Sequence, residues 1–409
     1  MTIKEAHERL EASEKSETLR LQKGSFTRTS PIGAKRIVGI ILRRISESLQ
    51  LCVEKFFDEI GEASVSKQAL SQARKKLNPE YVREYADMTS QIAAQDTDVP
   101  TYKGMRLIAI DGSTVALENT PELKEAFGTS GSKSNAATAI CSIAYGPLDH
   151  AIYDCRIDHI DADERVLAKA HVMRLTELGL TGSLLLHDRG YPSAGYIAFL
   201  YESGYNFVMR VKRKFNVKID EIKTQGWVEL THNNKSYPVR VLKLQLISGE
   251  TETLVTSLNK KQLPISEASQ LYFKRWKAET AYDLIKSKLE LENFSGKTKI
   301  SVLQDFYATM YLANLVSFAA EAADEAIAQA DSQKNLKYAR KSNQNRIISR
   351  LRTQFFIIIT EPCDTMRNAM LERLIDYIIR YPVSVVPGRS SPRKPPRKKR
   401  FFQNRPSVL

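Results

Sequence analysis

The hydrophobic and polar positions of this chain follow two different periods. Over residues 1–100 apolar residues recur every three or four positions, as in IVGIILRRISESLQLCVEKFFDEI, which predicts amphipathic helices. The next segment, VSKQALSQARKKLNPE, predicts a short helix that opens at Ser66 and closes at Asn78-Pro79. From residue 105 onward the period changes, and short apolar runs alternate with helical stretches.

The middle of the chain predicts a sheet interleaved with helices. Three strand-like runs come first: MRLIAI, ATAICSIAY and AIYDCRID. An amphipathic helix, a strand, a helix and a strand follow as DERVLAKAHVMRLTEL, SLLLHD, AGYIAFLYESG and NFVMRVK. This is the element order of an RNase H-like fold in the α/β class, an argument from order alone.

The rest of the chain first becomes strand-rich and then helical. The runs GWVEL, YPVRVLKLQLI and TETLVTSL predict strands, and ISEASQLYFKRWKAETAYDLIKSKLEL predicts one long helix. We therefore expect a helical N-terminal region at 1–100, the first part of the core at 101–212, a β-rich insertion at 213–262, the final core helices at 263–325, a helical C-terminal region at 326–387, and a disordered basic tail at 388–409.

The charge balance favours a polyanionic partner. The 61 Lys and Arg residues against 47 Asp and Glu leave a net charge of +14, which suits nucleic acid, although a merely basic soluble enzyme has the same composition. We expect no secretory signal and no membrane partner, because the first residues are charged and the apolar run 355–359 is short. The four cysteines form no C-x-x-C pair, which argues against zinc and fits reduced thiols in a cytoplasmic protein.

Two aspartates follow apolar strands. Asp111 comes after MRLIAI, and Asp188 comes after SLLLH. The ends of strands are where open α/β sheets place their chemistry, and two neighbouring strands would bring both carboxylates to common cations. The alternative is that each aspartate only caps the turn that follows its strand.

The predicted long helix carries four polar residues at a distinctive spacing. Tyr272, Arg275, Glu279 and Lys286 stand at offsets 0, 3, 7 and 14, which places them within about 60° of arc on one helix face. Such a face is a poor core stripe and a suitable wall for a site that holds a phosphodiester beside a metal. The alternative is a solvated face whose Arg275–Glu279 ion pair stabilises the helix by only about 0.2–0.5 kcal/mol.

The spacing Tyr272-x2-Arg275-x3-Glu279-x6-Lys286 is similar to the Tyr-Arg-Glu-Lys motif of bacterial insertion-sequence transposases of the insertion-sequence-4 type. The resemblance covers about residues 100–320. It implies a DDE transposase: an RNase H-like catalytic core with a β-rich insertion before the motif helix, preceded by a helical DNA-binding region and followed by a helical C-terminal region.

The resemblance also implies a reaction. Asp111, Asp188 and Glu279 would be the catalytic and metal-binding carboxylates for two Mg²⁺ ions, with Mn²⁺ as a substitute. The enzyme would bind the ends of its insertion sequence, cleave them by two-metal hydrolysis, and join the 3′-OH ends to target DNA. The implied partners are the terminal repeats, the target DNA, and a second copy of the chain in a homodimer on DNA, in the nucleoid of a bacterial cytoplasm.

Several residues are candidate DNA contacts. By the resemblance, Arg275 and Lys286 would grip backbone phosphates and Tyr272 would hydrogen-bond one. Trp276 and Trp227 are candidates to stack on an unpaired base, and packing is the alternative for each. The remaining candidates are basic residues for which a solvated surface is the alternative: Arg210, Lys212, Lys67, Arg74, Lys75 and Lys76.

Two other functions remain open at this point. One is a catalytically silent, transposase-derived protein that only binds DNA. The other is an RNase H-fold DNA nuclease that cuts without strand transfer. A cleavage assay with a divalent metal separates the first from a transposase, and a strand-transfer assay separates the second.

Overall fold

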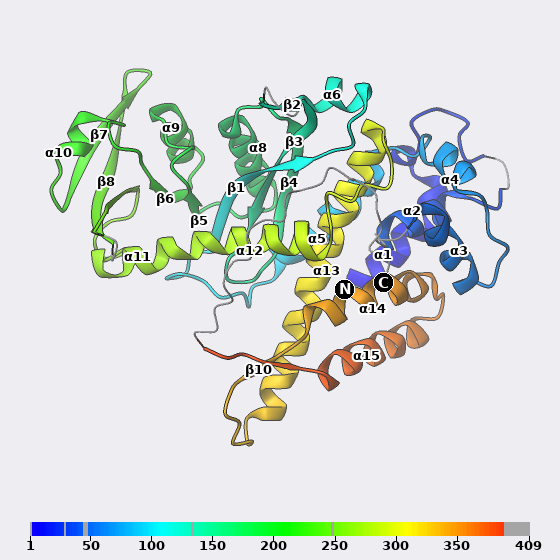
Figure 1. Ribbon diagram of the computed structural model, residues 1–409. Helices are drawn as coiled ribbons and strands as arrows, with labels where there is room; N and C mark the ends of the chain where they lie inside the picture. The colour runs from blue at the N-terminus through cyan, green and yellow to red at the C-terminus, as the bar shows by residue number, and fades with distance from the viewer. Residues whose placement is uncertain (1, 28–29, 44–47, 132–134, 247–248, 388–409) are drawn as a thin grey trace.

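The computed structural model describes residues 2–27, 30–43, 48–131, 135–246 and 249–387 (Figure 1), so the predicted basic tail lies outside the described residues. The N-terminal region is helical, as predicted. The predicted apolar stripe is divided between two helices, and Asn78 caps the start of a new helix with Pro79 in its first turn. The helices are α1 (Thr2–Glu11), α2 (Ala34–Arg43), α3 (Leu49–Glu59), α4 (Lys67–Arg74) and α5 (Pro79–Gln95).

One mixed sheet forms the centre of the molecule. Its strands lie in the order β4-β3-β1-β5-β6-β9-β8-β7, and the short β2 (Thr129–Ser130) also pairs with β3. β1 is parallel to β5, and β5 is parallel to β6, whereas the other pairs are antiparallel. The bounds are β1 (Leu107–Ala116), β3 (Ala136–Tyr145), β4 (Ile152–His159), β5 (Leu184–His187), β6 (Asn206–Arg210), β7 (Gln225–His232), β8 (Lys235–Gln245) and β9 (Thr251–Thr256).

The strands predicted as a β-rich insertion extend the central sheet. β9 pairs antiparallel with β6, and β8 and β7 follow it outward. A short helix, α10 (Val217–Glu221), precedes them. Because β6 would otherwise be an unpaired edge, pairing with β9 satisfies its backbone groups and continues the sheet.

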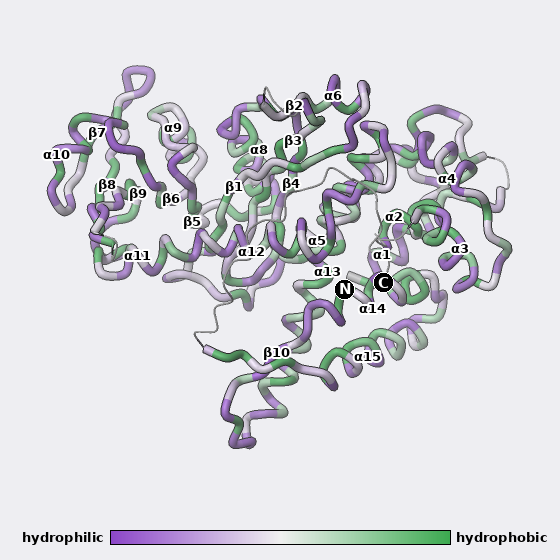
Figure 2. Tube along the Cα trace, viewed as in Figure 1, coloured by the Kyte–Doolittle hydropathy of each residue, from purple (hydrophilic) through white to green (hydrophobic). Residues whose placement is uncertain are grey.

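Alternate residues of the central strands face two different cores. Leu107 and Ala109 pack on one side of β1, and Ile108 and Ile110 pack on the other. The second side is covered by α8 (Glu164–Glu177) and α9 (Ala194–Glu202), and Figure 2 shows the apolar positions concentrated along the central strands. Both faces are buried, so the strands are nearly continuous apolar runs rather than alternating ones.

The first side of the sheet is covered by the predicted long helix, which is irregular. It runs as α11 (Ile265–Phe273), a 3₁₀ turn (Lys274–Trp276), α12 (Lys277–Asp283) and a π-helical turn (Leu284–Lys288). Figure 1 shows these segments in one line across the sheet. π-turns widen the helix locally and are frequent at functional sites.

The helical regions before and after the sheet pack against each other. The 33-residue helix α13 (Lys299–Asp331) lies against α5, and Asn314 donates to the carbonyl of Ile152 on β4 and to Thr89. The remaining elements are α6 (Pro121–Phe127), α14 (Gln344–Thr360), α15 (Asp364–Arg380) and the short strands β10 (Arg340–Lys341) and β11 (Val383–Ser384). No helix in the described part of the chain combines the length and the apolarity needed to cross a bilayer.

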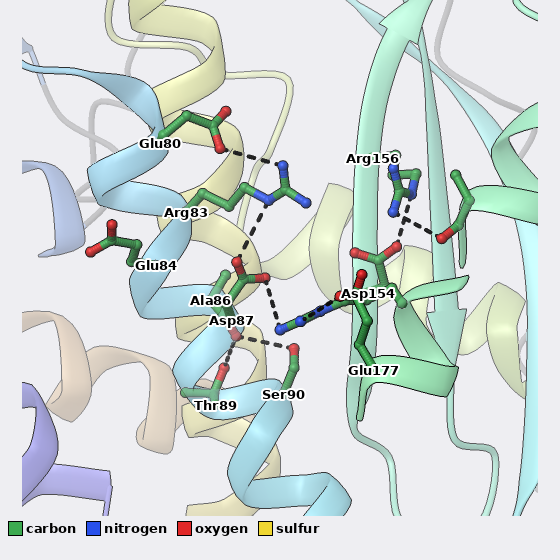
Figure 3. A network of polar contacts seen from close by, with 12 residues as sticks. Glu80, Arg83, Glu84, Ala86, Asp87, Thr89, Ser90, Asp154, Arg156 and Glu177 are labelled. Carbon is green, nitrogen blue, oxygen red and sulfur yellow. Dashed lines mark hydrogen bonds and ion pairs between the residues drawn. The ribbon is translucent and has the colours of Figure 1, made fainter. Parts of the chain in front are cut away.

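A polar network ties α5 to the sheet and to α8 (Figure 3). Asp87 of α5 pairs with Arg83 at 3.7 Å and with Arg174 of α8 at 3.8 Å. Nearby on β4, Asp154 pairs with Arg156 at 2.8 Å. Ser90 of α5 donates to the carbonyl of Ile152 on β4 at 3.0 Å, so α5 is joined to the sheet as well as to α8.

Candidate active site at the ends of β1 and β5

The two predicted aspartates stand side by side. Ile110 of β1 is in register with His187 of β5, and Asp111 and Asp188 are the next residues on each strand. Because the strands are parallel and about 4.8 Å apart, the two carboxylates leave the same edge of the sheet. β1 does not end at Asp111 as predicted but continues to Ala116, because β3 still pairs with it where β5 has stopped.

Asp111 sits in an environment that disfavours its charge. Its side chain is 19% exposed, and its Oδ1 accepts a hydrogen bond from the backbone N–H of Gly112 at 3.1 Å. Burial raises the pKa of Asp111 to about 6; the Arg275 charge opposes the rise, and the carboxylates of Asp188 and Glu164 add to it. A cation at this edge would relieve the burial and the repulsion together.

Three of the four motif side chains contact β1 or β5. Tyr272 is buried and donates its hydroxyl to the carbonyl of His187 at 3.1 Å. Arg275 is buried beside Asp111, and Lys286 donates from Nζ to Ser113 Oγ at 2.6 Å and to the carbonyl of Thr114. Tyr272, Arg275 and Lys286 therefore face the sheet, whereas the fourth motif residue, Glu279, forms an ion pair only with Arg275 among the described residues.

Arg275 stands between two carboxylates. Its Nη1 lies 3.4 Å from Asp111 Oδ2, and its Nη2 lies 3.9 Å from Glu279 Oε1. Burial lowers the pKa of Arg275, but the neighbouring groups outweigh it and raise the pKa overall: Tyr272, Asp111, Asp188 and Glu279. The guanidinium thus places one positive charge between the carboxylates of Asp111 and Glu279.

The donor set fits a hard divalent cation, although its members are not drawn together. Within the described ranges, no three His, Cys, Asp or Glu side chains are close enough to ligate one ion. Glu279 has a side chain that is 45% exposed, whereas Asp111 is mostly covered. Carboxylate oxygens are the ligands that Mg²⁺ takes, usually one or two at a time with several waters retained.

The two predicted tryptophans lie in different places. Trp276 is 47% exposed on the motif helix, stacks on the exposed Phe273 with ring centroids 6.5 Å apart, and has Arg275 over its ring. Trp227 is 48% exposed on β7, five strands and roughly 24 Å across the sheet from β1. The fold therefore brings Trp276, and not Trp227, beside the carboxylates.

Of the two basic candidates at the end of β6, one is already paired. Arg210 forms an ion pair with Glu252 at 3.3 Å, and its side chain is 32% exposed. Lys212 is exposed just past the end of β6. Burial raises the pKa of Glu252, against the lowering effect of Arg210 and Arg275, so this pair also borders the site.

The basic candidates in α4 and in the turn after it also differ in exposure. Lys67, Lys75 and Lys76 are exposed and accessible to a phosphate backbone. Arg74 is buried and donates to Gln304 Oε1 at 2.6 Å, to the carbonyl of Ser301 at 3.0 Å and to Asp305 Oδ1 at 2.6 Å. The prediction that Arg74 contacts DNA is therefore wrong: its guanidinium joins α4 to α13.

Three residues near the site were not among the predicted ones. Tyr282 donates its hydroxyl to the carbonyl of Asp111 at 2.8 Å, which links the helix of Glu279 to β1. Glu164 is the first residue of α8, and the buried Tyr191 lies three residues after Asp188. The sequence alone gave no signal for Glu164, because the direction of β4 relative to β1 depends on the pairing of both strands with β3.

Comparisons with known proteins give the chain a family. Residues 102–315 match the family of the transposase DDE domain, a span that includes Asp111, Asp188 and Glu279. The chain is 24% identical over 275 residues to the transposase InsG for insertion sequence element IS4 of Escherichia coli strain K12. That match covers 62% of this chain and 61% of the length of the relative.

A solved structure is also similar over most of the chain. It is the synaptic complex of the piggyBac transposase with hairpin DNA, determined by cryo-EM, at 11% identity and a TM-score of 0.49. The likeness covers 94% of this chain and 82% of that chain. On the match of its central 102–315 segment, which is more than half of its length, this chain belongs to the transposase DDE domain family.

Proposed function

We propose that this protein cleaves the ends of an insertion sequence and joins the resulting 3′-OH ends to target DNA. The observation that carries the proposal is the register of Ile110 with His187, which places the next residues, Asp111 and Asp188, at the same edge of the sheet, with Arg275 between Asp111 and Glu279 of the facing helix. Two carboxylates at one sheet edge, with a third carboxylate and an arginine on the facing helix, suit phosphoryl transfer. This reaction needs positioning and charge stabilisation more than covalent chemistry.

The catalytic core is proposed to be RNase H-like. Its support is the order β4-β3-β1-β5-β6, in which β3 is antiparallel to its neighbours and β5 and β6 are parallel to β1. The helices α8 and α9 follow β4 and β5, as the sequence order predicted. On this proposal β7, β8 and β9 are the insertion, α1–α5 the DNA-binding region, and α14 and α15 the C-terminal region.

Asp111, Asp188 and Glu279 are the residues that would hold two Mg²⁺ ions, or Mn²⁺ in their place. When bound, these ions would activate the attacking oxygen and stabilise the leaving 3′ oxygen of an in-line displacement. The protein's own part is to keep Asp111 and Asp188 on rigid strands and to deliver Glu279 from a helix. Arg275 would then turn from the carboxylates toward a backbone phosphate, for which its planar fork is suited.

Other contacts with DNA follow from exposure and charge. The stacked Phe273–Trp276 pair offers an exposed aromatic surface beside Arg275, where an unpaired base would stack. Lys286 would contact phosphate from its place beside Ser113. The exposed lysines of α4 and Lys212 would add contacts without sequence preference, and a dimer on DNA would let two ends be cut together.

The test uses DNA duplexes taken from either side of the protein's own reading frame. Asp111→Asn, Asp188→Asn and Glu279→Gln should each abolish end cleavage with Mg²⁺ while binding to the same duplex is retained. Asp376→Asn, an exposed aspartate on α15, is the control and should cleave like the wild type. Normal cleavage by the Glu279 variant contradicts the assignment.

The same assay separates the two other functions. A wild-type protein that binds the ends but cleaves none of them with either Mg²⁺ or Mn²⁺ is the silent DNA-binding protein. A wild-type protein that cleaves but never joins a pre-cut 3′-OH end to a second duplex is the nuclease.

A further inference from the structure

A fourth carboxylate faces the edge where Asp111 and Asp188 stand. Glu164 is the first residue of α8, directly after the N-cap residue Asp163. β4, which leads into α8, is antiparallel to β3 and therefore runs in the same direction as β1. The start of α8 is thus delivered to the same edge of the sheet as the two aspartates.

Two glycines make room for the Glu164 carboxylate. A methyl group at Gly112 would lie 3.0 Å from Glu164 Oε1, and one at Gly190 would lie 3.3 Å from Oε2. Both separations are tighter than ordinary van der Waals contact. Since Gly112 follows Asp111 and Gly190 lies two residues after Asp188, the carboxylate sits in a cradle between the two aspartate-bearing segments.

A buried hydroxyl is directed at the same place. Tyr191 is 2% exposed, and its hydroxyl has no hydrogen-bond partner among the described residues. The hydroxyl lies 3.7 Å from where a methyl group at Gly112 would be. A buried polar group without a partner costs on the order of 1–3 kcal/mol, so its presence points to a ligand that satisfies it.

The charge around Glu164 is unbalanced. Asp111 and Glu279 share Arg275, and Glu252 has Arg210, but neither Glu164 nor Asp188 forms an ion pair within the described ranges. Burial raises the pKa of Glu164, and the charges of Asp163 and Asp188 raise it further. Half-buried carboxylates with no direct ion pair are unfavourable unless a cation joins them.

We propose that Glu164 completes the divalent-cation site of this transposase, accepting hydrogen bonds from the water around a cation held by Asp111 and Asp188. The proposal rests on the function proposed above. It fits the spacing of the carboxylates, which are not close enough for three to ligate one ion directly, because Mg²⁺ uses few carboxylates and keeps much of its water. Tyr191 supplies a further hydrogen-bonding group to the same water.

An acidic residue at the position of Glu164 also has a simpler structural explanation, and a control substitution separates it from the proposed role. An acidic residue in the first turn stabilises a helix through its dipole, and Glu80 of α5 is an example: it lies two residues after the N-cap residue Asn78 and pairs with Arg83. Both substitutions, Glu164→Gln and Glu80→Gln, remove one charge from a first turn. Only the first removes a charge from the aspartate edge.

The experiment measures the affinity of the DNA-free protein for Mn²⁺ by isothermal titration calorimetry, with the melting temperature in EDTA recorded alongside. Groups that orient a metal site from outside its ligands typically contribute about 10–100-fold in affinity. We expect Glu164→Gln to bind Mn²⁺ at least tenfold more weakly without a lower melting temperature in EDTA. Glu80→Gln should bind Mn²⁺ like the wild type.

Two further variants make each outcome decisive. Tyr191→Phe removes one hydroxyl and no charge, and should weaken Mn²⁺ binding several-fold even if Glu164→Gln does not fold. Asp111→Asn should remove most Mn²⁺ binding. If Asp111→Asn does so while Glu164→Gln and Tyr191→Phe bind like the wild type, the role of Glu164 is overturned and the proposed function stands. If Asp111→Asn binds Mn²⁺ as tightly as the wild type, the cation site itself, and the proposed function with it, is overturned.

Discussion

Arg275 Nη1 lies 3.4 Å from Asp111 Oδ2, so a residue of the motif helix neutralises a carboxylate at the centre of the sheet. The same guanidinium reaches Glu279 with its other nitrogen. It is nearly fully buried, so these interactions are poorly screened by water. The arrangement makes Arg275 both a clamp between helix and sheet and a cation that a divalent ion would replace.

Replacing Arg275 should therefore separate these two roles. Arg275→Ala leaves the carboxylates of a buried pair without their partner, and should lower the free energy of unfolding in EDTA by about 3–5 kcal/mol. Urea denaturation measures this change, and added Mn²⁺ should restore part of the loss because it supplies the missing charge. Lys235→Ala breaks an exposed pair with Glu202 and should leave the urea midpoint unchanged. An Arg275→Ala protein as stable as the wild type contradicts the clamp.

Removing the charge of Asp111 should have the opposite effect on stability. Its pKa is raised from 3.8 to about 6, chiefly by burial, so the folded state holds a proton that the unfolded state releases between those values. The free energy of unfolding consequently falls as pH rises through this window. Above pH 6 in EDTA, Asp111→Asn should be more stable than the wild type by up to about 3 kcal/mol.

The pH series supplies the internal control for this prediction. At pH 4 the Asp111 carboxyl of the folded wild type is protonated, so the variant and the wild type should have similar urea midpoints. A variant that is less stable than the wild type at pH 8 in EDTA would show that Arg275 outweighs burial at this carboxyl.

Strand and helix positions at the site were predictable because local patterns determine them. The apolar runs before Asp111 and Asp188, and the spacing of Tyr272, Arg275 and Glu279, were visible in the sequence alone. The pairing of Ile110 with His187 was not visible, since register between distant strands depends on the whole sheet. That pairing is what turns two strand-end aspartates into one site.

The residues that sequence reasoning misplaced depend on distant partners. Arg74 looked like a DNA contact because its neighbours are basic, but Asp305 and Gln304 of α13 bury it. Glu164 looked like part of a helix start, and its role depends on Gly112 and Gly190 in other segments. A single short helix contains no signal for either contact.

The buried pair of Asp154 and His171 predicts a second pH effect. Asp154 accepts hydrogen bonds from His171 Nδ1 and Arg156 Nε, each at 2.8 Å. Burial raises the pKa of Asp154, but His171 and Arg156 outweigh it and leave the pKa below 3.8. Its contribution to stability is thus complete above pH 3.8 and is lost as pH falls through the lower folded value.

Asp154→Asn should therefore destabilise the fold at neutral pH and less so in acid. Breaking this buried pair should lower the free energy of unfolding by about 3–5 kcal/mol at pH 7. The difference from the wild type should shrink below pH 3.8, as measured by urea denaturation across pH 2.5–7. Asp376→Asn on the exposed face of α15 should show no difference at either end of the series.

The last prediction sets Arg74 against its neighbours Lys75 and Lys76. Arg74→Ala leaves Asp305 buried without its counter-charge, and should lower the free energy of unfolding by about 3–5 kcal/mol. The double variant Lys75→Ala/Lys76→Ala changes only exposed side chains, so its urea midpoint should match the wild type. If these lysines contact phosphates, the double variant should weaken DNA binding at every sequence and reduce the slope of log affinity against log salt by about 2. Fluorescence anisotropy with a labelled duplex at several salt concentrations measures this slope. An unchanged slope would remove Lys75 and Lys76 from the DNA-binding surface.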